Sequence, residues 1–182
     1  MFEGTQSHFG GRLPRLASYA LEWGLQRCPP FTGARAINLS LTLAGARVAS
    51  SANFWGMPTL VGPDRPASRL QVGALCGLNF GCFFELDETI TLDDHVAVGH
   101  EVMFLTRTHD PSDPQRRGRP SGAKPIKIEA GSWLGSRCTI LPGVTVGAGS
   151  VIGASVVVTE NVPPNTLVAG ARRVSLAKWR GK

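Results

Sequence analysis

Features that would indicate a membrane-spanning or disulfide-bonded protein are missing from this sequence. No apolar run approaches the roughly 18 residues that span a bilayer. The N-terminus does not match a secretory signal, because Glu3 lies early and the apolar run at 16–21 ends at Glu22. The few cysteines include no CxxC pair, so we expect reduced, structural thiols and a cytoplasmic location. They are Cys28, Cys76, Cys82 and Cys138.

Aromatic residues are also scarce, at 7% of the chain, and no basic stripe is interleaved with them. Nucleic acid is therefore not an expected partner. The formal charge of +6 favours an anionic one instead, such as the phosphates of a cofactor, an acidic glycan or a membrane surface. With 22 glycines, 13 prolines and 42% hydrophobic residues, the 182-residue chain is expected to form one turn-rich folded domain.

The dominant pattern is a six-residue repeat over 72–107 and again over 126–161. Each repeat places apolar residues two apart, and 22 of the 24 such positions are apolar where the composition predicts about ten. The positions are Val72/Ala74, Leu78/Phe80, Phe84/Leu86, Ile90/Leu92, Val96/Val98, Val102/Phe104, Ile126/Ile128, Ser132/Leu134, Cys138/Ile140, Val144/Val146, Ser150/Ile152 and Val156/Val158. A helix or an ordinary strand does not sustain this period, whereas a short strand bent at a corner and repeated does. The pattern predicts a β-solenoid with about two coils in each block.

Three parts are expected along the chain. Residues 1–45 form an N-terminal segment, 46–162 the solenoid, interrupted by a projecting loop at about 107–125, and 163–182 a basic tail. Over 13–26 the apolar spacing predicts an amphipathic helix, which either packs on the solenoid or lies on a membrane surface. Over 31–71 the repeats are imperfect, and we expect a first, irregular coil there. Its apolar residues include Ile37, Leu39, Leu41 and Leu43.

A solenoid this narrow is filled by its own side chains, so chemistry must use its outer faces, the loop or a groove against another copy. Cys138 falls on an inward position. Asn79 and Trp133 lie between inward residues, so strand alternation turns them outward. An outward tryptophan favours a homo-oligomer.

The run WLGSRCTILPGVTVGAGSVIG at 133–153, followed by Val-Thr-Glu-Asn-Val-Pro-Pro, resembles the hexapeptide-repeat acyltransferases. It is most similar to the branch of maltose, galactoside and exopolysaccharide-type O-acetyltransferases, and the resemblance covers about 72–175. It implies an all-β fold, a left-handed parallel β-helix, assembled as a homotrimer. It also implies acetyl transfer from acetyl-CoA at clefts between protomers, without a metal. The handedness rests on the resemblance alone, because crossovers between parallel strands are usually right-handed.

His109, in Thr-His-Asp at the start of the loop, matches the catalytic histidine of this family. A sugar hydroxyl is a poor nucleophile, and an imidazole can remove its proton as it attacks a thioester. Without the resemblance, the sequence favours a solvated loop histidine at this position. Asn79 and Asp87 match acceptor-binding positions, although Asp87 is also a plausible turn carboxylate. Asp110 is a candidate to orient the imidazole.

On the donor side, three small residues match positions that line the coenzyme A groove: Ser136, Ala154 and Thr159. The amide of Ser136 is a candidate to stabilise the thioester oxyanion. Glu160 replaces a lysine that the family often shows, and the usual Val-Ala-Gly-Asn-Pro-Ala stretch is altered. Arg172 and Arg173 are then candidate phosphate ligands, or solvated tail charges.

Two other groups of residues have alternative interpretations. His95 and His100 have a spacing seen in zinc-binding γ-type carbonic anhydrases, but the only upstream histidine, His8, lies in the N-terminal tail, so we expect no metal. The basic residues of the loop form a solvated face or attract an acidic glycan. These are Arg107, Arg116, Arg117, Arg119 and Lys124.

The sequence therefore predicts an acetyl-CoA-dependent O-acetyltransferase acting on a carbohydrate hydroxyl, of a surface polysaccharide or a sugar intermediate. An N-acetyltransferase of an amino sugar is an alternative within the enzyme class. A non-catalytic trimeric β-helix scaffold is the alternative outside it.

Overall fold

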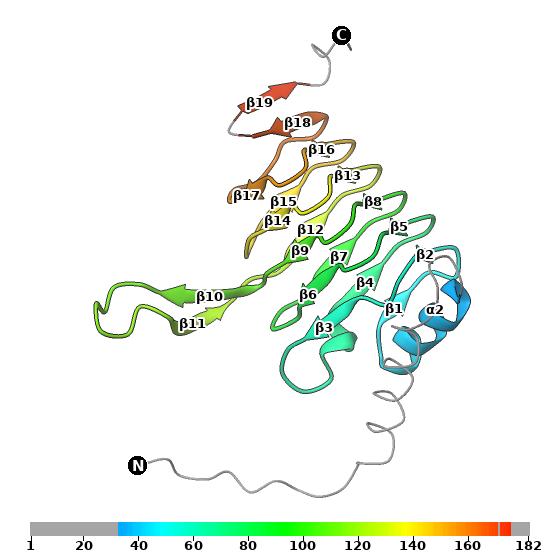
Figure 1. Cartoon of the computed structure of the whole chain (residues 1–182), viewed down its shortest axis with the longest axis horizontal. Helices are drawn as coiled ribbons and strands as arrows, with labels where there is room; N and C mark the ends of the chain where they lie inside the picture. The colour runs from blue at the N-terminus through cyan, green and yellow to red at the C-terminus, as the bar shows by residue number, and fades with distance from the viewer. Residues whose placement is uncertain (1–32, 171, 176–182) are drawn as a thin grey trace, which may run out of the picture.

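The computed structural model describes residues 33–170 and the backbone of 172–175, and its strands form three sheets around one axis (Figure 1). Sheet A contains β1 (Arg47–Val48), β4 (Leu70–Val72), β7 (Ile90–Leu92), β12 (Ile126–Ile128) and β15 (Thr145–Val146). Sheet B contains β2 (Asn53–Phe54), β5 (Gly77–Leu78), β8 (Ala97–Val98), β13 (Trp133–Leu134), β16 (Val151–Ile152), β18 (Thr166–Ala169) and β19 (Arg172–Ser175). Sheet C contains β3 (Thr59–Val61), β6 (Phe83–Glu85), β9 (Met103–Phe104), β14 (Thr139–Ile140) and β17 (Val157–Val158).

Each coil passes from sheet A to B to C, and stacked strands pair in parallel. The chain is thus an all-β, left-handed parallel β-helix, which confirms the predicted fold class. The block at 126–161 makes two coils, β12–β14 and β15–β17, as the repeat predicted. An irregular first coil, β1–β3, precedes the regular ones.

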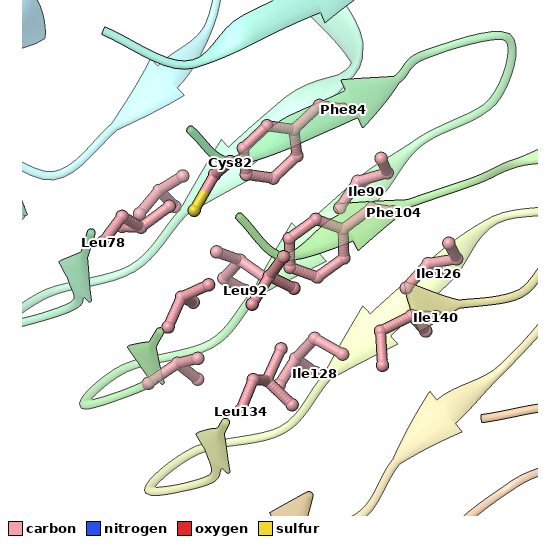
Figure 2. Close-up of a cluster of buried hydrophobic side chains, with 14 of the residues drawn as sticks. Leu78, Cys82, Phe84, Ile90, Leu92, Phe104, Ile126, Ile128, Leu134 and Ile140 are labelled. Carbon is pink, nitrogen blue, oxygen red and sulfur yellow. The ribbon is translucent and has the colours of Figure 1, made fainter. Parts of the chain in front are cut away.

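The interior is filled by the side chains that the repeat assigned to it. Every predicted inward position is buried except Ala74 and Phe80, and Cys138 is fully enclosed. Figure 2 shows this packing, in which the rings of Phe84 and Phe104 stack with centroids 4.7 Å apart. The serines at inward positions satisfy their hydroxyls on the backbone, as Ser132 does by donating to the carbonyl of Gly147 at 3.0 Å.

The two exceptions have a common cause, an irregular coil length. Partners in sheet A lie 24, 20, 36 and 18 residues apart in successive coils: Arg47 with Gln71, Leu70 with Ile90, Ile90 with Ile126, and Lys127 with Thr145. The second coil therefore has two residues more than the repeat of 18. The inward positions before this insertion are Cys76 and Cys82, which are buried, rather than Ala74 and Phe80, which lie at corners.

All the extra residues lie at one corner, where the chain passes from sheet C to sheet A. From sheet A to B, and from B to C, every coil takes six-residue steps, as from Leu92 to Val98 to Phe104. The first coil inserts a loop containing η1 (Pro66–Arg69), and the second inserts Asp87 and Glu88. The third inserts a hairpin of β10 (Arg107–Asp110) and β11 (Arg119–Ala123), which projects from the solenoid in Figure 1. The projecting loop predicted over 107–125 is this hairpin.

One end of the solenoid is covered by α2 (Ala34–Leu43), beside β1 and β2 (Figure 1). The expectation of a coil at this point is wrong for residues 34–43. Ile37 and Leu41, one helical turn apart, are buried, whereas Leu39 and Leu43 are 60% and 75% exposed. Apolar residues two apart imitate a strand, but in a helix such neighbours lie on opposite faces, so Ile37 and Leu41 face the core while Leu39 and Leu43 face solvent. The helix predicted over 13–26 lies outside the described residues.

At the other end, sheet B continues past the expected boundary at 162. β18 pairs in parallel with β16, and β19 returns antiparallel to β18. The boundary is therefore placed too early, because Pro163 and Pro164 lie at a corner and do not end the solenoid. Within the part of the chain that the structure describes, no helix has the length and apolarity needed to cross a bilayer.

Candidate active site

The predicted site residues lie on the two edges of sheet C. We call the corner from sheet B to C the B–C edge and the corner from sheet C to A the C–A edge. Strand register stacks Phe80, His100, Ser136 and Ala154 along the B–C edge, and Asn79 lies there one residue earlier, level with Gly99. The C–A edge carries Glu85, Asp87, Leu105, Leu141 and Thr159, together with the hairpin that contains His109. One chain therefore brings His109 and Thr159 to the same edge but keeps Asn79 and Ser136 one sheet width away.

His109 is exposed on β10 and lines a groove of about 460 Å³ on the C–A edge. The groove is lined by Glu85, Leu105, Arg107, Thr108, His109, Leu141, Pro142 and Thr159. Thr159, predicted to bind the donor, thus shares a groove with the predicted base. Among the described residues, no hydrogen-bond partner occupies the His109 imidazole, which leaves its nitrogens available to ligands.

A β-bulge sets the local direction of His109. Thr108 pairs with Gly122 but His109 pairs with Pro120, so Ser121 is an extra residue in β11. Bulges twist a ribbon and redirect side chains, and they recur next to active sites. Proline is tolerated opposite His109 because a bulge does not require its missing N–H.

Asp110 does not orient the imidazole, because its carboxylate holds the hairpin together. One oxygen accepts from the amide of Ser112 at 2.9 Å, and the other pairs with Arg119 at 2.8 Å. These bonds, chiefly those from Ser112, hold the pKa of Asp110 below its ordinary value.

A polar network anchors the base of the hairpin to the coil below it. The buried Thr106 hydroxyl donates to the carbonyl of Glu85 at 2.6 Å and accepts from the amide of Asp87 at 3.1 Å. The amide of Arg107 donates to the Glu85 carboxylate at 2.9 Å, and its guanidinium pairs with Asp87 at 2.5 Å. The Asp87 carboxylate raises the pKa of Arg107. From the sequence, Arg107 was expected to be one of the solvated loop charges, because its partner Asp87 lies 20 residues away and gives no local pattern.

Along the B–C edge the coils approach too closely for side chains at two positions. A Cβ on Gly99 would lie 2.6 Å from the amide nitrogen of Ser136, and one on Gly135 would lie 2.6 Å from that of Ala154. The neighbouring corner amides, those of Ser136 and Ala154, have no acceptor within residues 33–170. Unpaired donors on an exposed edge suit a carbonyl or developing oxyanion.

Asn79 is half-buried on the B–C edge, and its side-chain amide donates to the carbonyl of Val98 at 3.0 Å. Beside it, the rings of Phe80 and His100 lie 5.6 Å apart, and the amide of His100 donates to the Ser136 hydroxyl at 3.2 Å. The B–C edge therefore combines the predicted acceptor ligand Asn79 with the predicted oxyanion donor.

Arg172 and Arg173 lie on β19, of which only the backbone is described. The register places Arg172 opposite Ala169 and Arg173 opposite Val168, and Val168 pairs with Ile152. Arg172 thus lies on the last strand of sheet B, level with Gly153 and next to the position of Ala154. The phosphate-binding role of both arginines stays a prediction.

The described cysteines, Cys76, Cys82 and Cys138, are buried and free. Burial raises the pKa of Cys82 to about 11 and that of Cys138 to about 12, so neither thiol is a ready nucleophile. His95 lies at the corner from sheet A to B, away from His100 on the B–C edge. Residues 33–170 contain no group of three side chains arranged to hold a metal ion.

Comparison with known proteins agrees with this architecture. The family described as "Bacterial transferase hexapeptide (six repeats)" matches residues 125–160. The galactoside O-acetyltransferase of Escherichia coli is 35% identical over 103 residues, which cover 57% of this chain and 51% of that protein. The chain thus spans about half the length of the curated relatives it matches.

Solved structures extend the likeness beyond the matched segment. A maltose O-acetyltransferase from Clostridium difficile has a TM-score of 0.72 at 26% identity, covering 89% of this chain and 85% of that one. A hexapeptide-repeat acetyltransferase from Vibrio cholerae, complexed with acetyl-CoA, has a TM-score of 0.65 at 26% identity, covering 91% and 86%. Residues 125–160 thus match the hexapeptide-repeat transferase family, and solved hexapeptide-repeat acetyltransferases share the β-helix fold over most of the chain.

Proposed function

We propose that this protein is an acetyl-CoA-dependent O-acetyltransferase that acts on a carbohydrate hydroxyl. The observation that supports it best is the placement of two complementary half-sites on the edges of sheet C. His109 lines the groove of the C–A edge, and the unpaired amides of Ser136 and Ala154 lie on the B–C edge. Galactoside and maltose O-acetyltransferases among the relatives support the same reaction class.

The proposed reaction is a direct transfer. The His109 imidazole takes the proton of the acceptor hydroxyl while the hydroxyl oxygen attacks the thioester carbonyl carbon. The amide of Ser136 stabilises the oxyanion of the tetrahedral intermediate. The carbon–sulfur bond then breaks, the imidazolium returns its proton to the departing thiolate, and the products are the O-acetyl sugar and coenzyme A. Asn79 positions the acceptor, while Thr159 and Ala154 line the path of the donor.

This reaction requires two copies of the chain, because sheet C separates His109 from Ser136 within one copy. In a cyclic trimer the C–A edge of one protomer faces the B–C edge of the next, and each interface completes one site. Exposed apolar side chains on the outer faces of sheets B and C support such contacts. Trp133 is 56% exposed and Val157 57%.

Charge on the hairpin favours an acidic or polymeric acceptor, such as a surface-polysaccharide intermediate. Arg107 and Arg119 are paired with Asp87 and Asp110. Arg116 and Arg117, near the tip, have no acidic partner within residues 33–170 and are free to attract an anion. A cytoplasmic location stays a prediction; the buried free thiols agree with a reducing compartment.

The test combines calorimetric titration of acetyl-CoA with transfer of labelled acetyl groups to a panel of neutral sugars, acidic glycans and amino sugars. We expect donor binding and an O-acetylated product whose ester is released by mild alkali. Alkali-stable product from amino sugars alone would make the enzyme an N-acetyltransferase. Absence of binding at millimolar acetyl-CoA would contradict the proposal and leave the scaffold alternative.

A further inference from the structure

The hairpin that carries His109 is held to the solenoid at its base alone. Among the described residues, every hydrogen bond and ion pair from 107–123 to the solenoid comes from Arg107. The two ends of the hairpin are joined by a hydrogen bond from the amide of Lys124 to the carbonyl of Thr106, at 2.8 Å. A two-stranded ribbon has little stability of its own, so the bonds at its base decide where it points.

Asp87 is placed to serve this anchor and not the groove. One of its oxygens pairs with Arg107 at 2.5 Å, and the other, Oδ2, is buried without a hydrogen-bond partner among the described residues. The Asp87 side chain is 16% exposed and does not line the groove, whereas Arg107 and Glu85 do. The carboxylate thus faces the hairpin base.

We propose that Asp87 and Arg107 form a positioning pair that fixes the hairpin, and with it His109, against the solenoid. Asp87 then acts through Arg107, in place of the acceptor-binding role that the resemblance implies for it. The two-residue insertion at Asp87 and Glu88 brings a carboxylate to the level of Arg107. Arg107 lies two residues before the proposed base, His109. Errors of about 1 Å in such a base can reduce turnover about 100-fold.

A double-mutant cycle with Asp87→Asn and Arg107→Ala tests the pair, and its kinetic arm rests on the proposed acetyl transfer. We expect each single variant to reduce kcat about 10- to 100-fold with the acceptor KM nearly unchanged. The double variant should lose no more than about threefold beyond the worse single one, because both changes break the same link. Arg107→Lys, which keeps the charge but not the planar fork, should recover part of kcat.

The positioning pair would be overturned if Asp87→Asn raised the acceptor KM tenfold or more whether residue 107 is Arg or Ala. That result would mean that Asp87 binds the acceptor. The control is Lys127→Ala, which breaks the exposed pair of Lys127 with Asp93 at 3.3 Å on sheet A. It should leave kcat and KM unchanged. Unaltered thermal unfolding of each variant shows that the solenoid is intact.

Hydrogen exchange of the hairpin amides gives a readout that does not depend on activity. Arg107→Ala and Asp87→Asn should speed exchange over 107–123 while the solenoid amides keep their protection. If the wild-type protein transfers no acetyl group, the proposed function fails, and this measurement still decides the pair. Unchanged exchange in both variants would overturn the positioning pair even in an active enzyme.

Discussion

Along the B–C edge every coil advances by the same six residues, whereas at the C–A edge the first three coils insert six, two and eighteen residues beyond the repeat. The regular edge presents backbone: stacked glycines bring coils together and leave the amides of Ser136 and Ala154 open. The inserted edge presents side chains, among them Asp87, Arg107 and His109. In the proposed enzyme, the regular edge would bind the extended donor through its backbone amides, and the inserted edge would supply the catalytic side chain.

The most direct way to break the inserted edge is His109→Ala. Removing the base should reduce kcat about 10²- to 10⁴-fold, because general base catalysis contributes effects of that size. The regular edge stays intact, so affinity for acetyl-CoA should change little. Steady-state kinetics and donor titration measure the two effects. Full activity in this variant would show that another group removes the proton.

Phe84→Ala should affect both edges equally, because Phe84 is fully buried beneath sheet C and stacks on Phe104. Truncating a buried aromatic ring costs about 3–5 kcal/mol of unfolding free energy. Chemical denaturation measures this loss, with the exposed Met103→Ala on the same sheet as control. A loss below about 1 kcal/mol would mean that the coil collapses around the cavity.

Ala154→Trp should block the regular edge alone. Ala154 is exposed at a corner turn, so the fold can accept a larger side chain while the line of donors is obstructed. We expect KM for acetyl-CoA to rise about tenfold or more, the loss of about 1.4 kcal/mol of binding. Ala130→Trp, at the equivalent turn between sheets A and B, is the matched control. Equal effects at both positions would count against a donor path on the B–C edge.

The smallest expected effect is on the regular edge, at the exposed pair of Arg137 and Glu101. The Arg137 guanidinium donates to the Glu101 carboxylate at 2.7 Å and lowers the pKa of Glu101. Because the pKa of Glu101 is lower in the folded than in the unfolded state, its carboxylate stabilises the fold at pH values above the unfolded-state pKa. This stabilisation is lost as the pH falls through the folded-state pKa. Arg137→Ala should return the pKa of Glu101 toward its ordinary value in an NMR titration. An unchanged titration would mean that the pair does not persist in solution.

The repeat predicted the solenoid because an inward position admits only apolar or small residues, as at Leu134 and Ser150. The repeat gave the wrong inward residues where insertions and tertiary packing decide which residues face the core. The two residues inserted near Asp87 moved Phe80 to a corner, and the spacing of Leu39 and Leu43 suited strand and helix alike.

The chemistry of the site was less accessible from sequence than the fold. His109 was found through its resemblance to a family, because a loop histidine has no distinguishing local pattern. The link between Arg107 and Asp87 could not be predicted, since it depends on which coil stacks on which insertion. The sequence also did not show that His109 and Ser136 lie on opposite edges of sheet C. That placement depends on knowing at which corner each insertion lies, which only the structure shows.

In the proposed trimer, the two edges of one active site come from different copies of the chain. Mixing His109→Ala protomers with Ala154→Trp protomers, assayed at acetyl-CoA concentrations well below the raised KM, tests it, because each impaired parent retains the edge that the other lacks. After co-refolding at equal amounts, random assembly pairs an intact C–A edge with an intact B–C edge at about a quarter of the interfaces. We expect recovery of about that fraction of wild-type activity. Activity no greater than the sum of the two parents, in verified mixed trimers, would contradict it.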